Sequence, residues 1–351
     1  MIRLSLRLKH VAVFIGCSLF LAEVQAAPPL PEDMKAWALK SLDHVYNENY
    51  RVAESEIKRI IREYPDHPAG YFFYAAILDA RMERNHSDSR ENEFYRYCDL
   101  AINKGERLLE ERPGDLWARF FVAGANGAKG GYESRFERWI TAFRHGWQGV
   151  SIFREILDED STMRDALYGI GQYNYWRSAM TKLLWWMPGV EDKRDEAIEM
   201  MYDAKENGLF VRQAAAAKLL PMLCNEGDYD QALRIADTMT TRYPKCLVFH
   251  WGRVEALLGL ERFSGAEQTC KYILSRLTAE SVESDNYGLM LCNLYLATAQ
   301  YELGRYADAA AAIGTMKKLK VIDALERQAK DLLEKAEKIE RKARRRLAKK
   351  K

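Results

Sequence analysis

The glycine-rich stretch GANGAKGGY, from Gly124 to Tyr132, has the composition of a loop that binds phosphate groups. In nucleotide-binding proteins such a loop places Lys and then Ser or Thr directly after its last glycine, at a turn between a strand and a helix. Here Lys129 comes before Gly130 and Gly131, and the surrounding residues have a helical pattern. The spacing therefore argues against a phosphate site and favours a close helix contact followed by a turn.

Residues that commonly bind metals or act as nucleophiles are scattered along the chain. No HExxH motif, no Cys/His ligand spacing and no GxSxG motif occurs. Acidic pairs such as Glu110 with Glu111 fall at expected helix ends, where carboxylates are common. We therefore expect no metal, no cofactor and no catalytic residues, although a site assembled from distant residues stays open. Besides His10 near the N-terminus, the scattered histidines are His44, His67, His86, His145 and His250.

The segment DALYGIGQYNYWRSAM, residues 165–180, places aromatic side chains around two glycines. Residues three and four apart share one face of a helix. This spacing predicts a groove face for a protein or peptide partner made of Asp165, Tyr168, Gln172 and Tyr175. We expect Gly171 to allow close helix packing, and Tyr173 and Trp176 to point toward adjacent helices. The alternative is that the tyrosines only complete the packing of the stack.

Trp185 and Trp186 follow this segment and precede a Met-Pro pair. An exposed tryptophan pair can enter a membrane interface or hold a partner. A buried pair that joins two repeats is the alternative, and it is the more common arrangement.

The C-terminal part is expected to form one long helix, because apolar residues recur every three or four positions from Ile322 to Ala343. Its first half should cap the fold. Its end is basic and predicts contact with anionic lipid, envelope polymer or an acidic partner; a solvated tail is the alternative. The basic residues are Arg341, Lys342, Arg344, Arg345, Arg346, Lys349, Lys350 and Lys351.

The net charge of +2 at pH 7 conceals an uneven distribution. Without the eight basic residues of the tail, and without the three basic residues and Glu23 near the N-terminus, the chain keeps 42 basic and 50 acidic residues. An acidic body argues against a general nucleic-acid-binding protein.

The N-terminal residues have the pattern of a secretory signal peptide. Arg3, Arg7 and Lys9 precede an apolar run over 11–22, and small residues allow cleavage after Ala26. We expect export to the periplasm or cell envelope. An uncleaved anchor and a lipoprotein acylated at Cys17 are weaker alternatives.

Five cysteines follow the predicted cleavage site: Cys98, Cys224, Cys246, Cys270 and Cys292. The number is odd, no CxxC pair occurs, and most occupy positions where a helix would bury a small apolar residue. Buried thiols are therefore favoured over a set of disulfides.

A 34-residue period is the clearest internal signal. The stretch that begins at Gly227 places Tyr229, Ala232 and Pro244 at fixed offsets. Residues of the same kind recur at Tyr50, Ala53 and Pro65, at Phe263 and Ala266, and at Gly304, Tyr306 and Ala309.

These positions resemble those of the tetratricopeptide repeat. The resemblance implies an all-α fold, a right-handed superhelical solenoid in which each helix pair covers the apolar side of the previous pair. We expect this domain over residues 27–320 and a capping helix with a basic tail over 321–351. Two features depart from the repeat: Arg253 and Val254 replace a large and a small apolar residue, and Pro221 predicts a kink in a helix.

Residues 135–275 are also similar to a group of exported bacterial repeat proteins and, distantly, to a eukaryotic family linked to inclusion bodies and lipid droplets. The similarity rests on ALYGIGQYNYW and a Trp-Met-Pro turn, and it implies a role without catalysis. We therefore predict an exported, non-enzymatic scaffold that binds a protein partner in its concave groove. The alternative is an envelope-surface tether that uses the basic tail. An enzyme or carbohydrate binder that uses the aromatic groove is a third, weaker reading.

Overall fold

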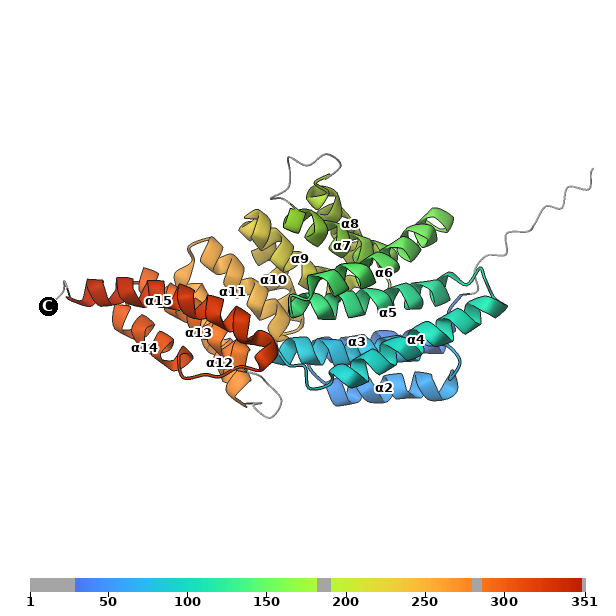
Figure 1. The fold of residues 1–351 in the computed structure, drawn as a ribbon, viewed down its shortest axis with the longest axis horizontal. Coiled ribbons are helices and arrows are strands. Elements are labelled where there is room, and N and C mark those ends of the chain that lie inside the picture. The colour runs from blue at the N-terminus through green and yellow to red at the C-terminus, as the bar shows by residue number, and fades with distance from the viewer. Residues whose placement is uncertain (1–28, 182–190, 280–285, 349–351) are drawn as a thin grey trace, which may run out of the picture.

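The computed structural model describes residues 29–181, 191–279 and 286–348, and these residues form α-helices, one short 3-10 helix (η2) and no strand (Figure 1). The predicted signal peptide, Trp185 and Trp186, and Lys349 to Lys351 lie outside the described residues. None of the described helices is both long and apolar enough to cross a membrane.

Consecutive helices form antiparallel pairs that stack along the molecule. The first helices of the pairs are α1 (Glu32–Tyr46), α3 (Pro68–Asn85), α5 (Leu116–Arg135), α7 (Asp165–Thr181), α9 (Arg212–Glu226), α11 (Leu247–Gly259) and α13 (Asn286–Glu302). Their partners are α2 (Tyr50–Glu63), α4 (Glu91–Glu111), α6 (Trp139–Glu159), α8 (Arg194–Asn207), α10 (Tyr229–Arg242), α12 (Phe263–Ala279) and α14 (Tyr306–Met316). A final helix, α15 (Glu326–Ala348), follows η2 (Asp323–Leu325). The predicted all-α solenoid of helix pairs is confirmed.

The residues that define the 34-residue period mark the start of the second helix in four of the pairs. Tyr50, Tyr229, Phe263 and Tyr306 are the first residues of α2, α10, α12 and α14. The small residue three positions later is completely buried in each case, at Ala53, Ala232, Ala266 and Ala309. An alanine there lets two helices approach closely, which explains why the period is visible in the sequence.

The turn before these helices uses a left-handed residue two positions before the aromatic. Glycine takes this position at Gly227 and Gly304, with φ of 80° and 75°. Glutamate takes it with φ of 56° or 57° at Glu48, Glu137 and Glu261. The α5–α6 pair follows the same pattern, with Glu137 in the turn, Trp139 as the aromatic and the buried Ala142 as the small residue.

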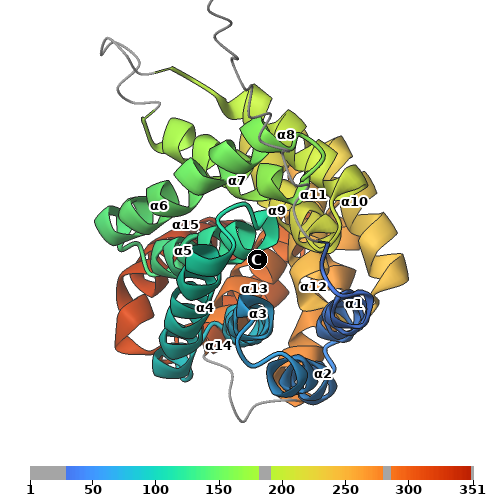
Figure 2. The ribbon, with the colours of Figure 1, turned by 90° about the vertical axis from the view of Figure 1, so that its right-hand side faces the viewer.

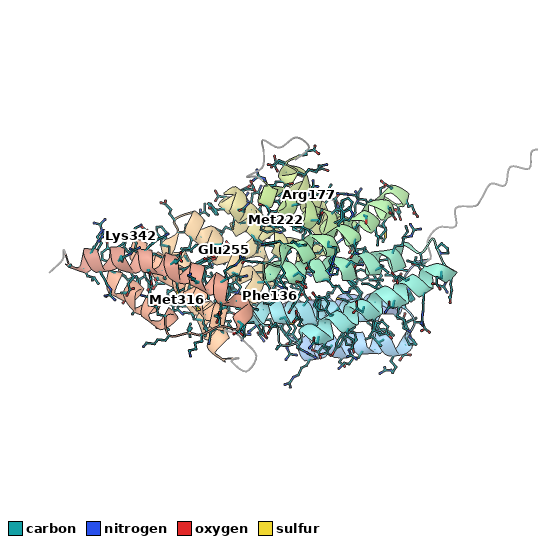
Figure 3. The ribbon with its side chains drawn as sticks, viewed as in Figure 1. Phe136, Arg177, Met222, Glu255, Met316 and Lys342 are labelled. Carbon is teal, nitrogen blue, oxygen red and sulfur yellow. The ribbon has the colours of Figure 1, made fainter. Side chains whose placement is uncertain are left out.

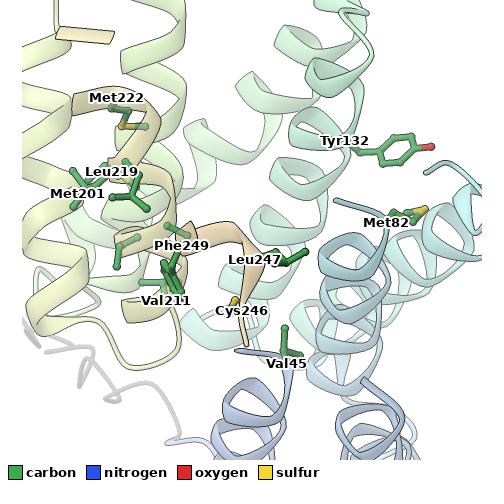
Figure 4. Packing of buried hydrophobic residues seen from close by; sticks show 14 of the residues in the cluster. Val45, Met82, Tyr132, Met201, Val211, Leu219, Met222, Cys246, Leu247 and Phe249 are labelled. Carbon is green, nitrogen blue, oxygen red and sulfur yellow. The ribbon is translucent and has the colours of Figure 1, made fainter. Parts of the chain in front are cut away.

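The solenoid turns far enough for its N-terminal helices to meet its C-terminal helices. Seen along the long axis, α3, α5, α9 and α13 lie nearest the centre, and α2, α6, α8 and α10 lie at the periphery (Figure 2). The ring of Tyr46 in α1 packs on that of Tyr243 at 5.6 Å, and Phe73 in α3 packs on Phe210 at 5.1 Å. Figure 4 shows Val45 of α1 facing Leu247 at the start of α11.

Helix α15 closes the C-terminal end. It packs on α13 and α14 and buries Leu332 and Ala336. It also reaches back to the α5–α6 turn, where the Gln328 side chain donates a hydrogen bond to the Arg135 carbonyl at 2.8 Å and Arg327 pairs with Glu137. The helix therefore joins the end of the chain to its middle.

The five cysteines are free thiols, and all except the half-buried Cys224 are buried. This confirms the prediction of buried thiols over a set of disulfides. Helix α9 continues through Pro221 from Arg212 to Glu226.

Candidate functional site

Three inner helices bring two ion pairs together at the centre of the solenoid. Lys218 in α9 pairs with Glu83 in α3, across 135 positions of sequence. Arg135 at the end of α5 pairs with the carboxylate of Asp79, one turn before Glu83, and donates to the Asp79 carbonyl at 3.2 Å. These four residues form the inner charged cluster. Their side chains remain between 23% and 34% exposed, so the cluster is recessed but accessible.

Burial and neighbouring charges shift the pKa values of the ionisable groups in the cluster. Burial alone would raise the pKa of Glu83, but the positive charges of Lys218 and Arg135 outweigh it and hold the pKa at about 2. Burial opposes the charge of Lys218, yet Glu83 keeps the pKa of the ammonium group above its ordinary value. At Asp79 the effect of burial prevails over Arg135, and the pKa of the carboxyl group is raised. The charged forms therefore depend on each other.

Tyr168 and Gln172, two residues of the predicted groove face, lie on α7 beside this cluster. Both are half-buried, and they lie one helical turn apart. Burial raises the pKa of the Tyr168 hydroxyl, and Lys218 and Glu83 are the charges that act on it most. The cluster thus gains a phenol and an amide, which offer neutral donors and acceptors.

The structure gives the other two predicted groove residues internal partners. The Asp165 carboxylate is 3% exposed and accepts hydrogen bonds from the backbone N–H groups of Leu209 and Phe210, at 2.6 and 2.7 Å. It therefore holds the connection between α8 and α9. Burial raises its pKa, and these bonds oppose the rise.

Tyr175 is completely buried between α7 and α9. Its hydroxyl lies 3.0 Å from the Met222 carbonyl and 2.8 Å from a carboxylate oxygen of Glu226, which also pairs with Arg194. These contacts join three helices. Asp165 and Tyr175 thus serve the packing, and only Tyr168 and Gln172 of the four predicted residues remain accessible to a partner.

Tyr173 and Trp176 occupy another side of α7. Tyr173 packs on Phe143 and Trp147 of the adjacent helix α6, as predicted. Trp176 instead stacks edge-on against Tyr175 and is 37% exposed. It therefore faces solvent rather than only a neighbouring helix.

The glycine-rich stretch lies inside α5, as the spacing predicted. A side chain at Gly130 would place its Cβ 2.9 Å from the Ala142 carbonyl, so this glycine allows α5 and α6 to pack backbone to backbone. Among the described residues, no group of three His, Cys, Asp or Glu side chains is arranged to hold a metal ion.

A cavity of about 580 Å³ opens between α4 and α5, away from the inner charged cluster. Its acidic side chains already have partners within the protein: Glu133 pairs with Arg138, as does Glu91, and Asp99 pairs with Lys129. These pairs leave the cavity with few free polar groups, so it is a weaker candidate than the cluster.

The basic end of α15 is exposed where the structure describes it. The exposed residues are Arg341, Lys342, Arg344, Arg345 and Arg346. Arg344 pairs with Glu340 at 2.6 Å, and Glu340 also binds Lys317. Ala343 is buried on the opposite side of the helix, so packing orients the basic side chains toward solvent.

Several solved structures are similar to this chain. A tetratricopeptide repeat protein from Parabacteroides merdae is 14% identical and covers 87% of this chain and 99% of its own, with a TM-score of 0.39. The yeast protein Tom70 is 11% identical over 89% of this chain and 90% of its own, with a TM-score of 0.31. Human IFIT1, solved as a dimer with PPP-AAAA, is 13% identical over 77% of this chain and 69% of its own, with a TM-score of 0.32. No family model and no curated protein matches the chain.

The chain is an α-solenoid of tetratricopeptide-like helix pairs. This description rests on the stacked helix pairs, on the aromatic residues at the start of second helices and on the buried alanines three positions later. Sequence analysis did not find the inner charged cluster of this solenoid. Asp79, Glu83, Arg135 and Lys218 are ordinary charged residues on amphipathic helices, and only the turn of the solenoid brings them together.

Proposed function

We propose that the protein is an exported, non-enzymatic scaffold that binds a charged segment of another protein at the inner charged cluster, with Tyr168 and Gln172. The observation that carries this proposal is the Lys218–Glu83 pair, which is recessed among inner helices and still about a third exposed. Such a pair contributes little stability compared with apolar residues of the same volume, because each charge loses its hydration. Charges in this position are better suited to recognition.

The arrangement fits exchange of partners. A carboxylate of a bound peptide can take the place of Glu83 on Lys218 or of Asp79 on Arg135, because both cations bind carboxylates strongly in a partly dehydrated site. The Tyr168 hydroxyl and the Gln172 amide can bond to the peptide backbone. The fold supplies an extended inner surface for such a segment.

Capture of partners from the envelope fraction tests the proposal. We expect Tyr168→Ala combined with Gln172→Ala to weaken capture of the same partner that the wild-type protein retains. Gln268→Ala, an exposed glutamine on α12, is the matched control and should leave capture unchanged. Equal capture by the wild-type protein and the Tyr168/Gln172 variant would exclude this face as the binding site. Circular dichroism must show unchanged helicity.

Export rests on the N-terminal sequence alone. Fractionation of cells that produce the full chain, followed by N-terminal sequencing, should find the mature protein outside the cytoplasm and starting at Ala27. A cytoplasmic, uncleaved chain would contradict export and leave the inner charged cluster as a separate question.

A second candidate function is an envelope-surface tether through the basic tail. The row of exposed arginines and lysine at the end of α15 favours it, since several basic residues beside one another bind anionic lipid additively. We expect flotation with anionic vesicles to be salt-sensitive and to fall when residues 341–351 are removed. Flotation that is unchanged by this truncation would exclude the tail.

A further inference from the structure

The outer side of α6 and α7 exposes large apolar side chains. Six such side chains are exposed in the described part of the chain, and four of them lie on these two helices. On α6, Ile140 is 90% exposed and Trp147 is 51% exposed. On α7, Trp176 and Met180 are each 37% exposed. A concentration of this kind on one helix pair marks a contact surface.

Aromatic packing makes the two helices one continuous surface. The Tyr173 ring lies 6.0 Å from the Phe143 ring and 6.3 Å from the Trp147 ring. Gly146 allows this approach, because a Cβ there would lie 2.9 Å from the Tyr173 ring. The surface, called here the aromatic face, consists of Ile140, Phe143, Trp147, Tyr173, Trp176 and Met180. Tyr173 thus joins Trp147 of α6 to α7, where Trp176 packs on Tyr175.

Only positive charges accompany the aromatic face. From Trp139 to Arg154, α6 carries Arg144 and Arg154 and no acidic residue, and from Ala166 to its end α7 carries Arg177 and no acidic residue. Arg144 and Arg154 are exposed, and the Arg154 guanidinium lies 5.7 Å from the Trp147 ring centre. Apart from the basic end of α15, the remainder of the protein is acidic, so the positive charge beside the aromatic face is a local reversal.

We propose that the aromatic face binds the headgroup region of an anionic phospholipid bilayer. Tryptophan and tyrosine combine an apolar ring with a polar tip, and they concentrate at the boundary between headgroups and acyl chains. Ile140 and Met180 supply apolar area to enter this boundary. Arg144 and Arg154 lie where lipid phosphates would be, and arginine binds phosphate through several hydrogen bonds.

A lipid surface fits these observations better than a protein partner. Specific protein interfaces need roughly 800 Å² on each partner, with an apolar centre and a polar rim of mixed charge. The aromatic face is built from six side chains of two helices, and neither α6 from Trp139 to Arg154 nor α7 after Asp165 carries an acidic residue to pair with a partner's cations. Peripheral membrane contact needs only a few inserted side chains and cations of one sign.

The aromatic face is separate from both surfaces discussed above. Figure 3 places Arg177 on α7 and Lys342 on α15 far apart along the long axis of the molecule. The inner charged cluster lies on other helices, with Lys218 on α9 and Glu83 on α3; of the proposed partner site, only Tyr168 and Gln172 share α7 with the aromatic face. The proposal therefore goes beyond the proposed function and does not depend on it.

Flotation with vesicles tests the proposal on the full mature chain. Vesicles of phosphatidylglycerol mixed with phosphatidylcholine are compared with vesicles of phosphatidylcholine alone. We expect Ile140→Ser with Trp147→Ser to reduce the bound fraction on anionic vesicles about tenfold, because two inserted side chains are lost. The matched control, Val52→Ser with Leu303→Ser, removes two exposed apolar residues elsewhere and should bind like the wild-type protein.

Two further comparisons test the positive charge beside the aromatic face and the contribution of the basic tail. Arg144→Glu should also reduce binding to the anionic vesicles, whereas Arg62→Glu, on α2 and 70% exposed at its side chain, should not. The chain without residues 341–351 should lose less binding than the Ile140/Trp147 variant. Wild-type binding by the Ile140/Trp147 variant would overturn the proposal. A shift of that variant from dimer to monomer in light scattering, without any loss of flotation, would also overturn it and indicate a second copy as the partner.

Discussion

The carboxylate of Glu48, in the turn between α1 and α2, accepts a hydrogen bond from the backbone N–H of Leu247 at 3.0 Å, across 199 positions of sequence. Leu247 is the first residue of α11, so Glu48 satisfies one of the free N–H groups at the start of that helix. The same carboxylate binds Arg84 at 3.4 Å and Arg276 at 3.1 Å, and it is only 5% exposed. One side chain thus joins α1, α3, α11 and α12.

Substitution of Glu48 should destabilise the whole solenoid. Glu48→Ala removes the acceptor of the Leu247 N–H group and the carboxylate that two arginines share, and we expect a loss of about 2 to 4 kcal/mol in the free energy of unfolding. Urea unfolding followed by circular dichroism measures it. Glu261→Ala is the matched control, because Glu261 has the same φ of 57° but an exposed side chain. Equal losses in both variants would show that the turn, rather than the carboxylate, matters.

Glycine at Glu261 should stabilise the protein. A left-handed backbone costs a glutamate about 1 to 2 kcal/mol, and glycine avoids this cost while losing part of the gain to chain entropy. We therefore expect Glu261→Gly to raise the free energy of unfolding by about 0.5 to 1 kcal/mol. The same substitution at Glu48 should lower it, since the contacts with Leu247 and the arginines are lost. A destabilised Glu261→Gly protein would contradict this explanation of the turn.

Helix pairing could be predicted from the sequence because its determinants are local. An aromatic and a buried alanine three positions apart start α2, α10, α12 and α14, and both lie within one turn of helix. The α5–α6 pair escaped detection because the neighbouring second helices, α4 from Glu91 and α8 from Arg194, do not begin 34 residues before or after Trp139. The contact between Glu48 and Leu247 could not be predicted, since it depends on how far the solenoid turns.

The predicted groove face stays accessible only at Tyr168 and Gln172. Helical spacing correctly grouped Tyr168 and Gln172, but it cannot tell which side of α7 a later helix will cover. Helix α9 packs over Tyr175 through Met222 and Glu226, and the α8–α9 connection uses the carboxylate of Asp165. The charged residues opposite Tyr168 come from helices far away in the sequence.

His86 should make the stability of the solenoid depend on pH. It lies between Trp251 of α11 and Tyr287 of α13, and burial lowers its pKa from 6.5 to about 4. Between these values the unfolded chain binds a proton that the folded chain does not bind, so stability is complete above pH 6.5 and falls toward pH 4. We expect this histidine to account for up to about 3 kcal/mol of the loss.

Urea unfolding at several pH values checks this expectation. His86→Phe keeps a ring in the same place and should flatten the dependence between pH 4 and 6.5. The slope should not vanish, because burial also lowers the pKa of His67 to about 4. An unchanged slope in the His86→Phe protein would show that His86 does not cause the pH dependence of stability.

Variants of the Lys218–Glu83 pair should distinguish its contribution to stability from its role in partner binding. Lys218→Met leaves the Glu83 carboxylate recessed without its main cation, and we expect a loss of about 2 to 3 kcal/mol in the free energy of unfolding near pH 7. Lys218→Met with Glu83→Met removes both charges at nearly the same volume, so stability should return to within about 1 kcal/mol of the wild-type value. Partner capture should remain lost in this double variant, because the cation that binds the partner's carboxylate is gone. A double variant that is stable and also captures the partner at the wild-type level would show that the pair serves packing alone.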